Sequence, residues 1–87
     1  MYVILVYDVS VKRVSKVCQF LRMFLNWVQN SVFEGELTEA ELFQVERGLK
    51  EIIDENEDSI TIYIFSSEKL LKRKFLGIRK AKPSFII

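Results

Sequence analysis

YVILVYD, residues Tyr2–Asp8, is the stretch that decides the fold of this chain. Its first six residues are all large and apolar or aromatic, and β-branched and aromatic types dominate. A run of this length and character favours a short buried strand. Side chains alternate along a strand, so both faces of this one are apolar up to its last residue. A strand of that kind needs cover on both sides.

Asp8 ends this strand as its single carboxylate. A charge at the end of a buried strand must reach solvent, a partner or a metal ion, because burial without compensation costs free energy. Asp8 is therefore the first candidate for chemistry. The alternative is a helix-entry carboxylate that accepts hydrogen bonds from backbone N–H groups near Ser10.

An amphipathic helix is predicted to follow, with Ser10 as its N-cap and a change to strand near Asn26. Its apolar stripe comprises Val14, Val17, Cys18, Leu21, Phe24, Leu25 and Val28. Lys12, Arg13 and Lys16 lie in its first turns, just beyond Asp8. Positive charge there opposes the helix dipole and is stabilised by a nearby anion. With Ser10, these residues are candidates for binding phosphate; the alternative is a solvated helix face.

The segment Trp27–Leu37 mixes strand-forming residues with Asn30 and Gly35. This composition indicates either a bent or bulged strand or a tight hairpin, and the sequence leaves both open. Glu34 and Glu36 share one face of this segment. We expect them to be solvated or paired rather than catalytic.

A second helix is predicted from TEAE, a capping box in which Glu41 follows the Thr38 cap by three residues. We expect this helix to end near Glu55. Gly48 in its interior costs about 1 kcal/mol relative to alanine, which indicates close packing at that position. The segment Ser59–Phe65, SITIYIF, then repeats the character of the first strand and is predicted to be the second central strand.

Charge is segregated along the chain, although its net charge is only +1. The stretch 34–58 is acidic, and 59–87 is basic. Basic residues at this density form either a phosphate track or a solvated surface. The candidates for nucleic-acid contact are Lys72, Arg73, Arg79 and Lys80. The chain ends in the apolar residues Phe85–Ile87, which we expect to pair with a sheet edge.

The order of these elements predicts a single α+β domain over residues 1–87, a ferredoxin-like βαββαβ sandwich with both helices on one sheet face. The other face is then uncovered and apolar. A two-fold homodimer packed through the sheet faces is the simplest closed arrangement that covers it. Residues 83–87 are predicted to form an extra C-terminal strand, exchanged with the partner subunit.

Several classes of site are excluded by composition. The chain has no histidine, a single cysteine (Cys18) and no CxxC or HExxH pattern. Zinc sites, histidine-based triads and an intramolecular disulfide are therefore excluded. We expect a cytoplasmic protein without membrane association, because the first strand is too short to span a bilayer and lacks the features of a signal peptide.

Asp8 can still support chemistry on phosphate without histidine. Mg²⁺ prefers oxygen ligands and commonly takes one or two carboxylates together with water and substrate phosphates. A two-fold dimer supplies two copies of Asp8. If these meet at the symmetry axis, they can share one Mg²⁺ that serves hydrolysis of a phosphodiester.

Four blocks of sequence resemble the CRISPR-associated protein 2 family. They are YVILVYDVS at 2–10, KRVSKV at 12–17, WVQNSVFEGELTEAE at 27–41 and DSITIY at 58–63. The resemblance runs in order over essentially the whole chain. The opening block together with QNSVFEGEL is its most specific part.

The resemblance implies a ferredoxin-like homodimer with exchanged C-terminal strands and Mg²⁺ between symmetry-related aspartates, here Asp8. It also implies a role in acquiring new spacers, in which the dimer bridges CRISPR integrase subunits along double-stranded DNA. Some family members are metal-dependent endoribonucleases that act on single-stranded RNA, and others cleave double-stranded DNA. We therefore expect an endonuclease, most simply on RNA. A non-catalytic scaffold that binds double-stranded DNA is the alternative.

Three aromatic residues complete the candidate site: Tyr7, Trp27 and Phe33. For each, the alternative is packing in the core or at an interface. Some relatives carry arginine at the position of Trp27. The tryptophan cannot neutralise a phosphate as arginine does, but it can stack on a base. A monomeric RNA-binding module that stacks bases on its sheet is a weaker hypothesis, because Tyr2 and Tyr63 are too few aromatics for it.

Overall fold

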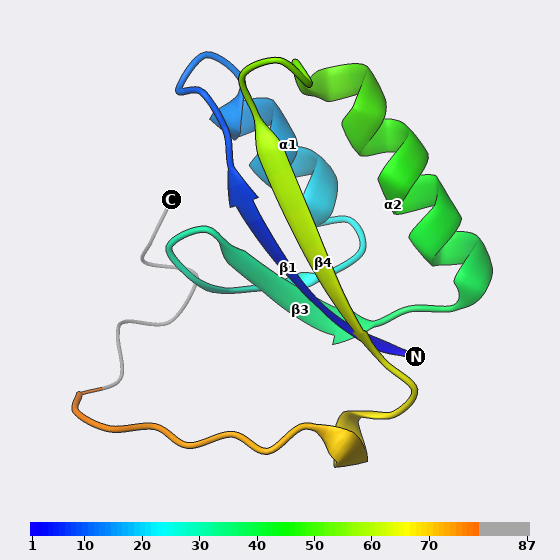
Figure 1. Ribbon diagram of the computed structural model, residues 1–87, viewed down its shortest axis with the longest axis vertical. Helices are drawn as coiled ribbons and strands as arrows, with labels where there is room; N and C mark the ends of the chain where they lie inside the picture. Colours follow the sequence, from blue (N-terminus) through cyan, green and yellow to red (C-terminus); the bar gives the residue numbers. More distant parts are fainter. Residues whose placement is uncertain (79–87) are drawn as a thin grey trace.

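The structure is a computed structural model that describes residues 1–78. Its elements are β1 (Tyr2–Asp8), α1 (Val14–Leu21), β2 (Asn26–Gln29), β3 (Val32–Glu36), α2 (Glu39–Ile52), β4 (Ser59–Phe65) and the short 3₁₀ helix η1 (Glu68–Leu70). Within the described part, the strands form one antiparallel sheet of order β2-β3-β1-β4. Both helices lie on one side of it (Figure 1). The predicted ferredoxin-like α+β sandwich is confirmed.

The core lies between the helices and one face of β1. Val3 and Leu5 are fully buried there, and Leu5 lies opposite the equally buried Phe33 of β3. The helices contribute apolar residues at helical spacing, which pack in the same cluster: Val17 and Leu21 from α1, and Val45 and Leu49 from α2. The apolar alternation seen in the sequence thus places one face of β1 in the core. Within residues 1–78, β4 lies at the edge of the sheet, so the prediction that Ser59–Phe65 is the second central strand is wrong. The second central strand is β3, because the β2–β3 hairpin pairs with the other side of β1.

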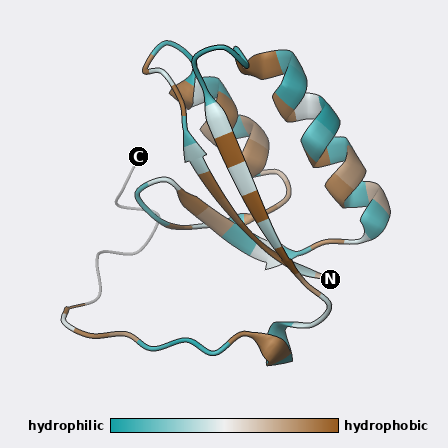
Figure 2. Cartoon of the chain, viewed as in Figure 1, coloured by the Kyte–Doolittle hydropathy of each residue, from teal (hydrophilic) through white to brown (hydrophobic). Residues whose placement is uncertain are grey.

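The opposite face of the sheet also carries apolar side chains. Val6 is 36% exposed and lies opposite Val32 and Thr61, while Tyr63, 54% exposed, lies opposite Ile4. Figure 2 shows the alternation of hydrophobic and more polar residues along β4, where Ile62 and Ile64 share the core face with Leu5 and Val3. We call the face with Val6 and Tyr63 the open face, because no helix of residues 1–78 covers it.

The first helix is shorter than predicted. Ser10 is not its N-cap: the Ser10 carbonyl accepts from the N–H groups of Arg13 and Val14, and its hydroxyl accepts from Lys12 N–H, so Ser10 starts a turn. α1 begins only after this turn and ends at Leu21. The predicted stripe residue Val28 lies instead in β2. Pairing of β2 with β3 overrides the helical spacing, because the strand completes the sheet beside the core.

The segment after α1 combines both alternatives left open by the sequence. β2 and β3 form a tight hairpin, and the register shifts between Trp27 and Gln29, which is a β-bulge. Asn30 at the turn has φ 41°, in the left-handed region that asparagine tolerates better than most residues. The hairpin and the bulge are therefore both present.

α2 begins as predicted. Glu41 N–H donates to Thr38 Oγ1 at 3.1 Å, and Thr38 N–H donates to Glu41 Oε1 at 2.9 Å, which completes the capping box. A Cβ built at Gly48 would overlap the Phe20 ring of α1, so the predicted close packing at this position is confirmed. The helix ends at Ile52, earlier than Glu55, because the backbone is already extended at the next residue.

Part of the prediction lies outside the described residues. The residues concerned are Arg79, Lys80 and the predicted C-terminal strand at 83–87. The described tail, residues 66–78, leaves the end of β4 and passes along the sheet side of the molecule (Figure 1). In residues 1–78, no helix is long and apolar enough to cross a membrane.

Candidate functional site

Asp8 is the last residue of β1, on the open face, and its side chain is exposed. It lies opposite Ser59 of β4 in the strand register. Within residues 1–78, its side chain makes no hydrogen bond or ion pair. A carboxylate with two unused oxygens at the end of a central strand is free to bind a cation or a ligand.

The helix-entry role that was the alternative for Asp8 belongs to Asp58. Ser10 N–H donates to Asp58 Oδ1 at 2.9 Å, and Asp54 N–H donates to Asp58 Oδ2 at 2.9 Å. The side chain of Asp58 is fully buried, whereas that of Asp8 is exposed. The alternative prediction, that Asp8 accepts hydrogen bonds from backbone N–H groups near Ser10, is therefore wrong, because the Ser10 N–H is already bonded to Asp58.

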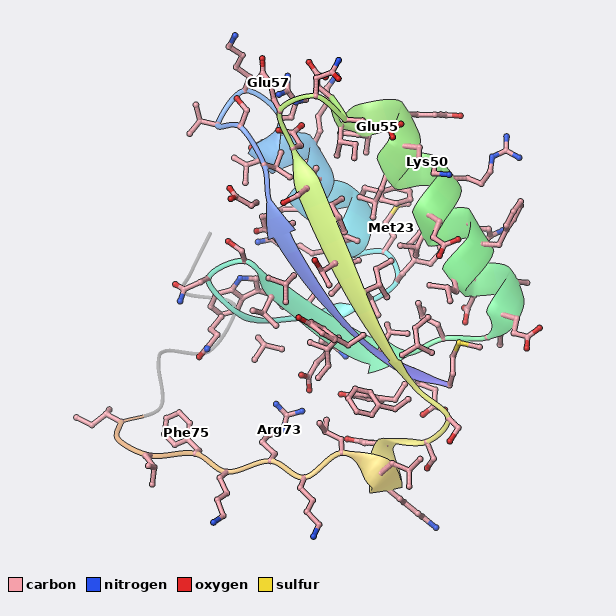
Figure 3. All side chains as sticks on the ribbon, viewed as in Figure 1. Met23, Lys50, Glu55, Glu57, Arg73 and Phe75 are labelled. Atoms are coloured by element: carbon pink, nitrogen blue, oxygen red, sulfur yellow. The ribbon has the colours of Figure 1, made fainter. Side chains whose placement is uncertain are left out.

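Arg13 is held by the same carboxylate. Its Nε donates to Asp58 Oδ2 at 2.6 Å, and its Nη2 donates to Asp58 Oδ1 at 3.1 Å and to Glu57 Oε1 at 3.0 Å. Hydrogen bonding to Arg13 holds the pKa of Asp58 well below its usual range, and the same bonds raise the pKa of Arg13. Figure 3 shows Glu57 beside the turn that follows β1. Arg13 thus ties this turn to the loop before β4, and its guanidinium is not presented to a phosphate.

The Arg13–Asp58 pair predicts how stability depends on pH. Because the pKa of Asp58 is lowered in the folded protein, its contribution is complete above the ordinary value of 3.8 and is lost as pH falls towards the lowered value. Asp58→Asn is therefore expected to lower the thermal midpoint at neutral pH. The difference between the two proteins should shrink progressively as the pH falls below about 4, in thermal unfolding followed by circular dichroism.

Glu57→Gln is the matched control for this substitution. Glu57 also pairs with Arg13, but its side chain is 57% exposed, so solvent weakens the interaction. We expect its unfolding profile against pH to run close to that of the wild type. Equal profiles for wild type and Asp58→Asn would contradict a folded-state role for this carboxylate.

A cleft of about 710 Å³ lies between α1 and the β2–β3 hairpin. Asp8 and Tyr7 line it from the end of β1, Arg22 from the end of α1 and Trp27 from β2. Ser31, at the hairpin turn, adds a hydroxyl. The fold thus brings Asp8, Tyr7 and Trp27, singled out from the sequence, into one cavity.

The aromatic candidates differ in their access to this cleft. Tyr7 is 6% exposed, and its hydroxyl lies 3.0 Å from Cys18 Sγ. Burial, with a smaller effect from this contact, raises the pKa of Tyr7 above its ordinary value. Trp27 is only partly buried, and its Nε1 donates to the Asn30 carbonyl at 3.0 Å. Phe33 is fully buried and packs against Tyr7 with ring centroids 6.1 Å apart, so it supports the site from the core.

The predicted basic contacts are not gathered in the cleft. Lys12 and Lys16 are exposed and are absent from its described lining, as is Lys72 on the tail. Arg73 Nη2 donates to Glu34 Oε2 at 2.5 Å. Figure 3 shows its side chain reaching from the tail towards the sheet.

Both glutamates of β3 are paired, as the sequence predicted. Glu34 accepts from Arg73 and from Tyr2 OH at 2.8 Å, and Glu36 lies 3.7 Å from the N-terminal ammonium. Burial, together with the bond to Glu34, raises the pKa of Tyr2 to about 12.

Sequence reasoning missed Arg22 as a site residue. The signal was present as a polar stripe on the first helix, with Ser15, Gln19 and Arg22 at intervals of four and three residues. All three line the cleft. Asp58 was also missed, because nothing local marks a carboxylate that bonds a turn 48 residues away.

The donor set of one chain suits Mg²⁺ only in part. Asp8 offers the hard oxygen atoms that Mg²⁺ prefers. Among the described residues, however, no group of three or more His, Cys, Asp or Glu side chains is placed to hold a metal ion. A single chain therefore supplies one free carboxylate at this position, and further ligands must come from water, substrate or a second copy.

Comparison with known proteins gives consistent matches. The family model described as CRISPR associated protein Cas2 matches residues 1–73. The chain is 60% identical over 80 residues to the CRISPR-associated endoribonuclease Cas2 of Pyrococcus furiosus, covering 92% of each protein. It is 54% identical over 87 residues to that of Methanosarcina acetivorans, covering 100% of each.

Solved structures agree with this. A crystal structure of a Cas2 protein matches with a TM-score of 0.84 and 48% identity, covering 100% of this chain and 98% of the other. Streptococcus pyogenes Cas2 at pH 6.5 matches with a TM-score of 0.78 and 35% identity, covering 88% of this chain and 100% of the other.

Proposed function

This chain belongs to the CRISPR associated protein Cas2 family, and on that premise we propose that it is a metal-dependent endoribonuclease that cleaves single-stranded RNA. We further propose that it works as a homodimer in the acquisition of new CRISPR spacers. The observation that carries the proposal is Asp8: an exposed carboxylate at the end of a central strand, without a side-chain partner in residues 1–78, that lines a cleft. The relatives above carry the name endoribonuclease.

The open face supports the dimer. Ile4, Val6 and Tyr63 lie on it, and it has apolar character without helical cover. Packing two such faces about a two-fold axis removes apolar surface from water and makes a closed assembly. Asp8 lies at the end of the same face, so packing of the two faces places both copies of Asp8 at the dimer interface.

In this proposal, the Asp8 carboxylates of the two subunits would hold one Mg²⁺. The bound ion supplies Lewis-acid stabilisation of charge on the phosphate and a more acidic water. Arg22 offsets the charge of the RNA backbone within the cleft. Lys12 and Lys16, exposed outside the cleft, contact flanking phosphates.

The test of this function is cleavage of end-labelled single-stranded RNA and double-stranded DNA by the purified protein, with Mg²⁺ and with EDTA. We expect cleavage of the RNA with Mg²⁺ and none with EDTA. The mass of the protein in solution, measured by light scattering, should be that of a dimer. Equal cleavage in EDTA would contradict a metal-dependent centre.

A second candidate function is a non-catalytic scaffold that binds double-stranded DNA and bridges integrase subunits. The described tail favours it, because Lys69, Lys72 and Lys74 are all exposed on a short segment. Such contacts release counterions, so DNA binding should weaken steeply with salt. Absence of cleavage of either substrate, together with salt-dependent DNA binding, would favour the scaffold over the nuclease.

A further inference from the structure

The cleft beside Asp8 contains polar groups that the fold does not use. Gln19 and Gln29 line it from opposite walls, α1 and β2. Within residues 1–78, neither side-chain amide makes a hydrogen bond, and the same is true of the Arg22 guanidinium. The cleft therefore presents free donors and acceptors as well as one cation.

The described lining of the cleft carries one charged residue of each sign. In its described lining, Arg22 is the one cation and Asp8 the one carboxylate. A guanidinium is suited to a phosphate, through charge-assisted and bidentate hydrogen bonds. The amides carry both donors and acceptors, the pattern needed to read the edge of a nucleobase.

Trp27 adds a stacking surface. Its Nε1 bond to the Asn30 carbonyl fixes the indole at the hairpin, and the ring remains partly exposed. Aromatic side chains stack on unpaired bases with little dependence on sequence. An indole that is already held by the protein loses less conformational entropy on stacking.

The size of the cleft fits a single nucleotide. Its volume of about 710 Å³ lies within the range of pockets that enclose small ligands. A base that is paired in a duplex cannot enter a cleft between a helix and a hairpin, because its edge and faces are covered by neighbouring bases. Sequence-dependent recognition of RNA relies on unstacked bases for this reason.

We propose that this cleft is a pocket for one unpaired nucleotide of the RNA, next to the phosphate positioned at Asp8. Trp27 stacks on its base, Gln19 and Gln29 bond the base edge, and Arg22 binds its phosphate. This inference rests on the proposed function, because it names the part of the substrate that the site selects. The pocket makes the enzyme specific for single strands, and the two glutamines set its base preference.

Trp27 is the single tryptophan of the chain, so its fluorescence reports on the pocket directly. The experiment titrates the four ribonucleoside 5′-monophosphates into the protein in EDTA, where the proposed cleavage does not occur. We expect saturable quenching that differs between bases, and none with ribose 5-phosphate, which lacks a base. A blunt RNA duplex should also leave the fluorescence unchanged.

Arg22→Gln should weaken binding of the monophosphates by about tenfold, the loss typical of one charge-assisted contact. Arg47→Gln is the matched control, because Arg47 lies on α2 over the Phe43 ring, away from the cleft. It should change affinity by less than about twofold. Equal effects of the two substitutions would overturn the assignment of Arg22.

The outcomes separate this inference from the proposed function. Quenching by monophosphates in a protein that cleaves no RNA would support the pocket and contradict the nuclease. Mg²⁺-dependent cleavage without quenching, unchanged in Trp27→Ala, would overturn the pocket and leave the nuclease standing.

Discussion

Asparagine in place of Asp8 is expected to lower the rate of Mg²⁺-dependent RNA cleavage by more than about 100-fold. Loss of a residue that only orients a metal ligand costs about 10–100-fold, and loss of a charged ligand should cost more. Asparagine keeps the size of the side chain and one oxygen but removes the negative charge. The measurement is single-turnover cleavage of labelled single-stranded RNA.

The fold should survive this substitution. The Asp8 side chain is exposed and without a partner in residues 1–78, so its replacement breaks no bond in the described part of the protein. We expect the thermal midpoint and the mass in solution to match those of the wild type. Glu55→Gln is the matched control, since it removes an exposed carboxylate within the α2–β4 loop, outside the cleft lining, and should leave cleavage unchanged.

Two results would contradict the role of Asp8. If Asp8→Asn cleaves as fast as the wild type, the activity comes from another site or from a contaminant. If it loses activity only because it no longer forms a dimer, Asp8 acts through assembly. Light scattering on the same samples separates these cases.

Glutamate in place of Val6 is expected to separate the proposed dimer and abolish cleavage with it. Val6 precedes Asp8 by two residues on the open face, so the two side chains lie roughly 7 Å apart. If the two Asp8 copies meet at the axis, the two copies of residue 6 lie near it as well. Like charges facing each other across an interface cost several kcal/mol, which corresponds to at least about a 100-fold weaker dimer.

Charge complementation makes this prediction specific. Val6→Lys alone should also be monomeric, whereas a mixture of Val6→Lys and Val6→Glu should form a heterodimer and regain cleavage. Phe43→Glu is the control, because it places the same charge at an apolar residue that is 58% exposed on α2. A Val6→Glu protein that stays dimeric at micromolar concentration would place the interface elsewhere.

Local signals in the sequence were sufficient for most of the fold. The alternation in Tyr2–Asp8 and Ser59–Phe65 predicted two strands with the bounds that the structure has, although the second lies at the edge of the described sheet and not at its centre. The Thr38 capping box predicted the first residue of α2. These signals succeed because the period of a strand and the bonds of a capping box involve residues only two or three positions apart.

The first helix shows where such signals fail. Its apolar spacing continues to Val28, but the chain leaves the helix at Leu21 and pairs β2 with β3. The choice depends on the sheet edge offered by β3 and on the buried space that Leu25 fills. Neither quantity can be read from the helical period of the segment itself.

The sequence by itself determined the sandwich, the position of Asp8 at the end of its strand and the family to which the chain is similar. It could not decide which carboxylate serves the turn after β1. Asp8 is close in sequence, but Asp58, 48 residues from Ser10, takes the backbone N–H and Arg13. Only the antiparallel pairing of β1 with β4, which places Ser59 opposite Asp8, brings Asp58 to this turn and leaves Asp8 free in a cleft.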